Sequence, residues 1–339
     1  MSDLVLLTGI SGFLGGHVAR ALLAAGYTVR GSVRNPAKAD QVRDTLGRAG
    51  ADLSRLQFVT LDLLRDEGWA EAAKGCRYLM HTASPLLLKM PADKMELIRP
   101  AVEGTERALR AGLDAGVARI VLTSSVVAIA YGHPPRATPF TAQDWTNPEG
   151  RGVNAYAESK TRAERRAWAI MKAAGREQDL VAINPALILG PLQDQDPGTS
   201  AVAVERLMDG SIPALPRMAF EIVDVRDVAD AHVAALTSPK AGGQRFPIGE
   251  RPLFFKEIAD ILRQHFPERA RKIPRFEIPD WAARLYAQFD ADLRAQRGEI
   301  GSVKRIDSSP AIALLGRALI PAEDAIVATG KSLIEQHII

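Results

Sequence analysis

The amino-acid sequence predicts an α/β protein, with a doubly wound parallel sheet followed by a smaller, mostly helical C-terminal lobe. Apolar runs typical of buried strands alternate with helical segments over residues 1–184. A glycine-rich turn separates the first apolar run from the first helical segment. After residue 184, prolines interrupt this alternation and helical patterns predominate. Together these observations indicate parallel βαβ units with an appended lobe.

The first strand and the turn after it show the most specific pattern. Residues 4–7 are an apolar run, and Gly9, Gly12 and Gly15 follow before a helical stretch at 16–25. Glycines at this spacing let the backbone turn tightly and approach a ligand. The free N–H groups and dipole of a helix N-terminus suit a pyrophosphate. The plain alternative is a glycine turn that binds nothing.

Five more strands are expected in the first part of the chain, at residues 27–34, 58–61, 78–82, 119–124 and 180–184. The predicted helices between them lie at 37–48, 67–74, 96–115 and 154–174. Strands joined through helices run parallel, so their carboxyl ends lie at one edge of the sheet, where ligands bind.

We expect a dinucleotide-binding domain at residues 1–184 and a substrate-binding lobe at 185–339. The lobe is interleaved, because part of 220–236 is expected to return to the core of the first domain. Its predicted elements are a strand at 220–225 and helices at 228–236, 252–266, 279–296 and 311–315.

Composition excludes several classes of protein. The net charge is +3 and the basic residues form no continuous tract, so we do not expect nucleic acid as a partner. Cys76 is the only cysteine, which rules out an intrachain disulfide and favours a reducing cytoplasm. We find no signal-peptide pattern and no run of about eighteen apolar residues, so no membrane association is expected. The six histidines lack metal-ligand spacing, so no metal is expected.

Two charged residues follow predicted strands and are candidates for adenosine contacts. Arg34 lies about twenty residues after the glycine turn, where an acid binds the ribose of NAD and a basic residue suits the 2′-phosphate of NADP. Arg30 shares its strand face and Lys38 lies just beyond. Asp62 follows the third strand and is a candidate for the adenine edge. The alternatives are a solvated charge for Arg34 and a helix cap for Asp62.

A second group of polar residues is a candidate for chemistry. Ser124 and Ser125 end the fifth strand, although two serines there are also common in turns. Tyr156 and Lys160 are four residues apart and share one face of a predicted helix. An ammonium beside a phenol favours the phenolate, so we expect Lys160 to lower the pKa of Tyr156. Tyr156 would then be a proton donor near neutral pH.

At this point the chain resembles the extended short-chain dehydrogenase/reductases, which have a Rossmann fold. The motifs are Thr8-Gly9-x-x-Gly12-Phe13-Leu14-Gly15, Asp62-Leu63, Thr123-Ser124-Ser125, Tyr156-x-x-x-Lys160 and Asn184-Pro185. The closer resemblance is to the dihydroflavonol 4-reductase-like branch, which includes cinnamoyl-CoA reductases and microbial NADPH-dependent ketone and aldehyde reductases. It rests on residues 33–36, 81–85, 101–105 and 184–191. Val126-Val127 stands where the plant enzymes carry Ala-Gly or similar, which argues against a flavonoid substrate.

The resemblance implies a role for each matching position. Ser125 would hydrogen-bond the substrate carbonyl, with Ser124 the less favoured candidate. Tyr156 would protonate the developing alkoxide, and Lys160 would hold the nicotinamide ribose and tune Tyr156. The residues implied in NADP binding are Gly9, Gly12, Phe13, Leu14, Arg34, Asp62, Leu63, Ala83, Thr123, Tyr156, Lys160 and Pro185. A homodimer that pairs the helices at 96–115 and 154–174 is common in the family.

The sequence therefore predicts a cytoplasmic, NADPH-dependent reductase of a ketone or aldehyde. Apolar side chains in the loops indicate a pocket for a fairly bulky apolar substrate: Trp145, Tyr131, Phe140, Met208, Met218, Phe220 and Leu86-Leu87-Leu88. One alternative is an NAD-dependent nucleotide-sugar epimerase or dehydratase, and another is a hydroxysteroid dehydrogenase. A dinucleotide-sensing regulator is the non-enzymatic alternative, but such proteins commonly lack the tyrosine–lysine pair.

Overall fold

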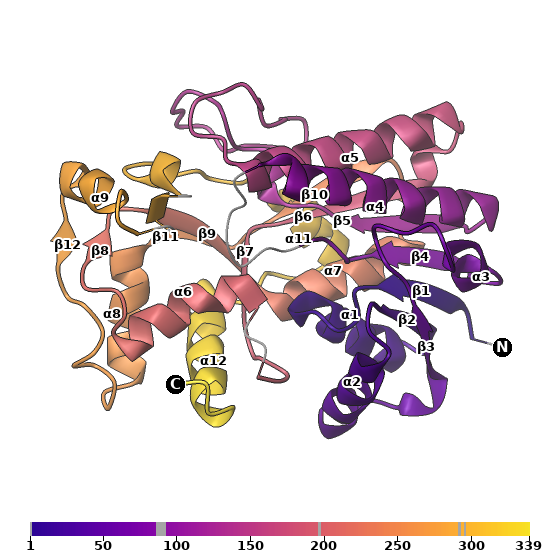
Figure 1. Ribbon diagram of the computed structural model, residues 1–339, viewed down its shortest axis with the longest axis horizontal. Helices are drawn as coiled ribbons and strands as arrows, with labels where there is room; N and C mark the ends of the chain where they lie inside the picture. The colour runs from indigo at the N-terminus through magenta and orange to yellow at the C-terminus, as the bar shows by residue number, and fades with distance from the viewer. Residues whose placement is uncertain (1, 86–92, 196–197, 291–292, 295) are drawn as a thin grey trace.

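A seven-stranded sheet forms the centre of the molecule in the computed structural model, which describes residues 2–85, 93–195, 198–290, 293–294 and 296–339 (Figure 1). Its strands pair in the order β10-β6-β5-β4-β1-β2-β3, and every pair is parallel. The strands are β1 (Leu4–Thr8), β2 (Thr28–Val33), β3 (Leu56–Thr60), β4 (Tyr78–His81), β5 (Arg119–Thr123), β6 (Leu180–Pro185) and β10 (Gln244–Ile248). The order reverses at β1, so the carboxyl ends of β1 and β4 flank the switch point where ligands bind in sheets of this kind.

Helices cover both faces of this sheet, as predicted for a doubly wound fold (Figure 1). One face carries α1 (Phe13–Ala24), α2 (Ala37–Arg48), α7 (Val225–Thr237) and α11 (Ser309–Leu315). The other carries α3 (Trp69–Ala73), α4 (Met95–Asp114) and α5 (Ala155–Ala173). The strands are apolar on both sides: Val5 and Leu7 pack toward the first set of helices and Leu6 toward the second.

A second lobe has its own core and smaller sheets (Figure 1). Its three-stranded sheet contains β7 (Leu187–Leu189), β9 (Ala219–Asp224) and β11 (Arg251–Phe254), and its two-stranded sheet contains β8 (Leu215–Pro216) and β12 (Glu277–Ile278). Its helices are α6 (Gly198–Asp209), α8 (Phe255–His265), α9 (Asp280–Tyr286) and α12 (Ala322–Glu335).

Short 3-10 turns occur in both parts of the chain: η1 (Leu53–Arg55), η2 (Val126–Ala128), η3 (Glu177–Asp179) and η4 (Arg297–Glu299).

The structure differs from the sequence prediction mainly beyond residue 184. The chain returns to the large sheet with α7 and also with β10, which the sequence did not predict. β10 contains Pro247, and a proline is compatible with a strand at the edge of a sheet, where β10 lies. The helix predicted at 252–266 starts only at Phe255, because residues 251–254 form β11. The division of the chain at residue 184 stays a prediction.

Candidate active site

The glycine turn after β1 is too tightly packed to hold side chains. Gly9 has φ +75°, and a Cβ there would lie 2.8 Å from the backbone of Ala83. A Cβ on Gly15 would lie 2.0 Å from the carbonyl oxygen of Gly9. The Gly12 N–H donates to that same carbonyl over 3.0 Å. These contacts fix a bare backbone turn at the carboxyl end of β1, as the glycine spacing predicted.

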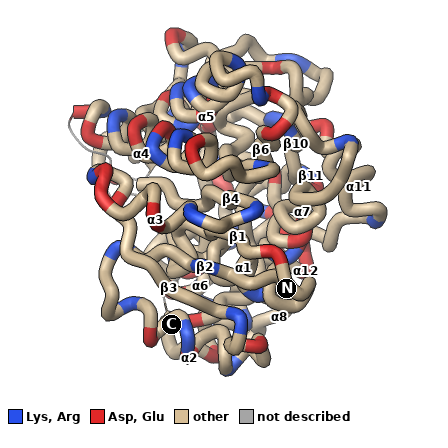
Figure 2. Tube along the Cα trace, turned by 90° about the vertical axis from the view of Figure 1, so that its right-hand side faces the viewer, with Lys and Arg blue, Asp and Glu red and all other residues tan. Residues whose placement is uncertain are grey.

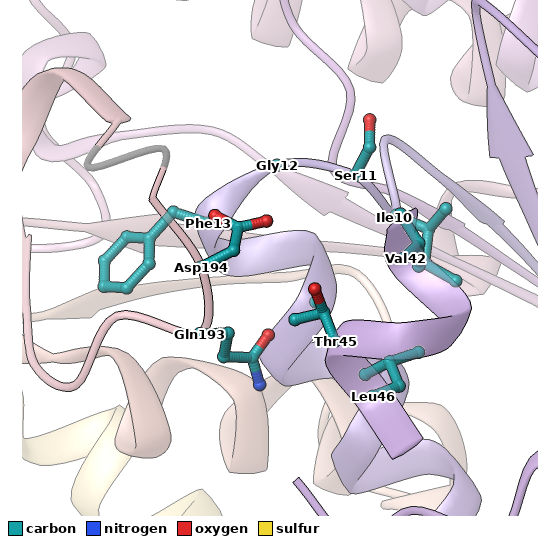
Figure 3. Close-up of a pocket in the computed structure, with 10 residues that line it drawn as sticks. Ile10, Ser11, Gly12, Phe13, Val42, Thr45, Leu46, Gln193 and Asp194 are labelled. Carbon is teal, nitrogen blue, oxygen red and sulfur yellow. The ribbon is translucent and has the colours of Figure 1, made fainter. Parts of the chain in front are cut away.

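A small cavity adjoins this turn at the start of α1 (Figure 3). Its lining includes Ser11, Gly12 and Phe13 from the turn and Gln193 from the segment after β7. In the described chain, α1 has neither a side-chain cap nor an acidic residue in its first turn. The Gln193 side-chain amide nitrogen is buried without a hydrogen-bond partner among the described residues. The bare turn and the available N–H donors fit the pyrophosphate of a dinucleotide.

The candidate adenosine contacts lie at the carboxyl ends of β2 and β3. Arg34 directly follows β2 and is exposed, and its guanidinium makes no hydrogen bond or ion pair within the described residues. Arg30 does not point to the same place, because it donates to the carbonyl oxygens of Ala72 and Lys74 over 2.7 and 2.9 Å. Arg30 is therefore held at the segment before β4, away from Arg34. Arg34 remains the candidate at this strand end.

Asp62 and Leu63 follow β3 beside α4. An Asp62 carboxylate oxygen accepts from the Leu64 N–H over 2.9 Å, so it stabilises a turn while its side chain stays half-buried. Leu63 packs so closely on α4 that a Cβ on Gly104 would lie 2.9 Å from the Leu63 Cβ. Arg107 on α4 donates to the Leu63 carbonyl oxygen over 2.8 Å. Packing on α4 thus fixes the backbone position of both residues.

Ser125 and Tyr156 meet at the end of β5. The Ser125 hydroxyl accepts from the Val127 N–H over 3.2 Å and donates to the Pro185 carbonyl oxygen over 3.3 Å. It lies near enough to the Tyr156 phenol to lower the pKa of that group. Asn154 caps α5 by accepting from the Ala157 N–H over 2.9 Å, which places Tyr156 in the first turn of the helix.

The pKa of Tyr156 moves in the opposite direction to the sequence prediction. Burial raises it above the usual 10.0, and the nearby Ser125 hydroxyl acts to lower it. Burial also lowers the pKa of Lys160 to about 8, while the carboxylate of Glu164 opposes that change. The prediction failed because desolvation of the phenol outweighs any effect of a neighbouring charge. At neutral pH the Tyr156 phenol is therefore protonated.

Ser124 faces away from Ser125 into a buried polar network that the sequence did not predict. Its hydroxyl donates to a Glu164 carboxylate oxygen over 2.5 Å. The Asn184 amide and the Arg245 guanidinium also donate to Glu164, over 2.8 and 2.6 Å. The one available signal was that Glu164 lies a helical turn after Lys160. This contact holds Ser124 in the buried network, whereas the Ser125 hydroxyl is bound to main-chain groups and lies beside Tyr156.

Two buried histidines hold the neighbouring strand ends. The Nδ1 of His81 lies 2.8 Å from the Thr8 hydroxyl, and the Nε2 of His232 lies 2.7 Å from the Thr123 hydroxyl. Burial lowers the pKa of His81 to about 3, with help from the charge of Lys160, and the pKa of His232 to about 4. Both rings are therefore neutral at physiological pH, and they act as structural partners of Thr8 and Thr123.

The residues expected to line an apolar pocket have different surroundings. Met208 and Met218 are buried in the core of the second lobe, which makes them packing residues. Phe140 packs with Ile129, Ala130 and Ile306 in a small separate cluster. Burial raises the pKa of Tyr131, and Glu299 and the nearby Tyr156 raise it further. Leu86-Leu87-Leu88 lies outside the described residues.

Within the part of the chain that the structure describes, we find no helix both long and apolar enough to span a bilayer. Nor do the described residues group three or more histidine, cysteine, aspartate or glutamate side chains in a way that suits a metal ion.

Comparison with known proteins identifies relatives over most of the chain. The family model "NAD dependent epimerase/dehydratase family" matches residues 5–249. A cinnamoyl-CoA reductase of Medicago truncatula is 35% identical over 79% of this chain and 82% of its own length. Tetraketide alpha-pyrone reductase 2 of Arabidopsis thaliana is 33% identical over 77% of this chain and 82% of its own length.

Solved structures agree with these sequence relatives. Yeast methylglyoxal/isovaleraldehyde reductase Gre2, complexed with NADPH, is 25% identical with a TM-score of 0.81, and the match covers 99% of this chain and 100% of that chain. Vestitone reductase from alfalfa, at 21% identity and a TM-score of 0.77, shows the shared fold. The chain therefore belongs to the NAD dependent epimerase/dehydratase family of extended short-chain dehydrogenase/reductases, in its dihydroflavonol 4-reductase-like branch.

Proposed function

We propose that this protein reduces a ketone or aldehyde carbonyl on a fairly bulky apolar substrate, with NADPH as hydride donor and Tyr156 as proton donor. The chain is an NADP-dependent oxidoreductase that acts on carbonyl groups, as the sequence predicted. Its relatives include several cinnamoyl-CoA reductases, and two Gre2 structures are complexes with NADPH. The proposal concerns the substrate class and the residues that perform the reaction.

The proximity of the Ser125 hydroxyl to the Tyr156 phenol, whose pKa it acts to lower, is the observation that carries the proposal. Bound NADPH supplies the hydride. Ser125 would donate a hydrogen bond to the substrate carbonyl oxygen, and the protonated Tyr156 would give its proton to the alkoxide that forms there. Because burial raises the pKa of Tyr156, the phenol keeps that proton at neutral pH. The direction of this change suits reduction better than oxidation.

Cofactor binding would use the turn and strand ends described above. The bare turn at Gly9, Gly12 and Phe13 would receive the pyrophosphate, and the exposed guanidinium of Arg34 would bind the 2′-phosphate. Lys160 would hold the nicotinamide ribose. A homodimer through α4 and α5 remains a proposal; the outer surfaces of these helices carry mixed acidic and basic residues (Figure 2).

The main alternative is epimerase or dehydratase chemistry on a nucleotide sugar. The family model covers such enzymes, and the structure of MoeE5 with UDP-glucose and NAD shares the fold at 18% identity and a TM-score of 0.74. Dehydratases of this fold place an acid pair beside the serine, whereas Val126-Val127 is apolar. A cofactor that stays bound through purification would favour the epimerase.

An NADPH-oxidation screen tests the proposal. The panel contains aromatic ketones, aldehydes, diketones, flavanonols and a cinnamoyl thioester, with NADH and UDP-glucose as comparisons. We expect NADPH oxidation with at least one bulky carbonyl compound and release of the matching alcohol or aldehyde. NADPH binding without turnover on the whole panel would contradict the proposal and favour a dinucleotide sensor.

A further inference from the structure

The carboxylate of Glu164 is completely buried and receives hydrogen bonds from four side chains. The donors are Ser124 Oγ at 2.5 Å, Asn184 Nδ2 at 2.8 Å, Trp168 Nε1 at 3.2 Å and the Arg245 guanidinium at 2.6 and 3.2 Å. A buried charge is tolerated only when it is paired and hydrogen-bonded, and Glu164 satisfies both conditions. Two of its donors lie at the ends of the strands that bear the active site.

The first connection runs from Glu164 to Ser125. Asn184, which donates to Glu164, also donates its side-chain N–H to the Ser125 backbone carbonyl oxygen over 3.4 Å. The Ser124 N–H donates to the Ile183 carbonyl oxygen over 2.7 Å, so the ends of β5 and β6 are held together on both sides. Glu164 thus fixes the backbone that presents the Ser125 hydroxyl.

The second connection runs from Glu164 to Lys160, one turn earlier on α5. Both side chains line the same small cavity, together with His81 from β4. The α4 residues that line it, Ala101 and Thr105, are uncharged, and the low pKa of His81 keeps its ring neutral. Glu164 is therefore the acidic group that faces Lys160 among the residues lining this cavity.

The third connection is to a loop beyond the sheet. Arg245 on β10 donates to the carbonyl oxygens of Ala142 and Asp144 over 2.8 and 2.6 Å. Its guanidinium carbon also lies 3.8 Å from the centre of the Trp145 ring. The Arg245 guanidinium thus donates to Glu164 and to the loop carbonyl oxygens, and its positive charge balances the carboxylate of Glu164.

We propose that Glu164, neutralised by Arg245, is a positioning residue that sets the orientation of Ser125 and keeps Lys160 protonated. The role in catalysis rests on the proposed function, since it assumes that Ser125 and Lys160 act on substrate and cofactor. Among the described residues, Glu164 makes no hydrogen bond to Ser125 or Lys160, and it would act through Asn184, Ser124 and the field at Lys160.

A matched pair of variants isolates the charge of Glu164. Glu164→Gln alone would leave the Arg245 guanidinium buried without its counterion, so both variants carry Arg245→Met. One keeps Glu164, and the other adds Glu164→Gln. Glu158→Gln is the control for a buried glutamate of the same helix, because Glu158 pairs with Lys94 and Arg162 and not with the strand ends.

The readout is the titration of Lys160 by NMR of ¹³C-labelled lysine, with its signal assigned through Lys160→Met. We expect a midpoint near pH 8 in the unmodified protein and in Glu158→Gln. The midpoint of the double variant should lie about one pH unit below that of Arg245→Met, because a facing carboxylate favours the charged amine. The alkaline limb of kcat/KM should move by the same amount, and kcat should fall as Ser125 loses its support.

Equal Lys160 midpoints in Arg245→Met and the double variant would overturn the proposal. A shift of equal size in Glu158→Gln would also overturn it, since any buried acid on α5 would then suffice. These results do not depend on the proposed function. An unmodified protein that reduces no carbonyl compound would refute that function, while the NMR titration would still decide whether Glu164 controls Lys160.

Discussion

The Thr8 hydroxyl and the His81 Nδ1 lie 2.8 Å apart, and this contact joins the ends of β1 and β4 where the strand order reverses. Thr8 further accepts from the Ala83 N–H at its hydroxyl and from the Thr82 hydroxyl at its carbonyl. The segment after β4 is therefore held against the glycine turn. A neutral imidazole is part of the structural support of the candidate cofactor site.

The low pKa of His81 predicts a loss of stability in acid. Its pKa of about 3 lies below the value of about 6.5 in an unfolded chain, so the unfolded state binds more protons between these values. The His81 contribution is present above pH 6.5 and is lost as pH falls toward 3, by at most about 4–5 kcal/mol. His81→Asn should flatten the dependence of unfolding free energy on pH in this window. Denaturant titrations at several pH values measure it, and an unchanged slope would contradict the assignment.

Tyr156→Phe keeps the ring and removes the proton donor. General acid catalysis contributes about 10²–10⁴-fold, so turnover should fall on that scale while NADPH still binds. Because the wild-type phenol has a raised pKa, Tyr156 should stay protonated into mildly alkaline pH, and the alkaline limb of kcat/KM should follow Lys160 instead. Steady-state rates and fluorescence titration with NADPH measure the two effects. Turnover equal to wild type would remove Tyr156 from the mechanism.

Lys160→Met should make the protein more stable in the absence of cofactor, and it should make the enzyme less active when NADPH is supplied. The pKa of Lys160 is about 8 in the fold and about 10.4 in an unfolded chain, so the unfolded state binds the extra proton between these values. Protonation in the fold therefore costs about 3 kcal/mol at neutral pH, and this cost disappears as pH rises from 8 to 10.4. The variant should gain stability at pH 7, and its advantage should vanish near pH 10. Thermal melts at both pH values test this, with NADPH affinity expected to drop in parallel.

Arg34→Ala should reduce the preference for NADPH over NADH. A hydrogen bond to a charged group contributes about 1.5–3 kcal/mol, equivalent to roughly 10- to 150-fold. Arg34 is exposed, so solvent screening favours the lower figure. Arg30 is bound to Ala72 and Lys74, which leaves Lys38 as the neighbour able to compensate. We expect kcat/KM for NADPH to fall and that for NADH to stay constant; an equal loss with both cofactors would mean that Arg34 only shapes the loop.

Several features followed from local sequence alone. The glycine spacing predicted the bare turn after β1, because adding a Cβ at Gly9 or Gly15 produces a clash with backbone only 2.0–2.8 Å away. Period and length predicted α4 and α5 to within one residue at each end. The family resemblance, carried by short motifs in a fixed order, predicted an oxidoreductase that uses NADP.

Other features were decided only by tertiary structure. β10 has too little local signal to be recognised, and becomes a strand because β6 offers an open edge. The direction in which the pKa of Tyr156 shifts depends on the burial of the phenol. The four-residue spacing between Tyr156 and Lys160 does not reveal that burial. Ser124 and Ser125 are identical in type, and only the position of Glu164 assigns one to the buried network. Sequence spacing determines which residues share a strand or helix, whereas burial and contacts between distant segments determine their charge and their partners.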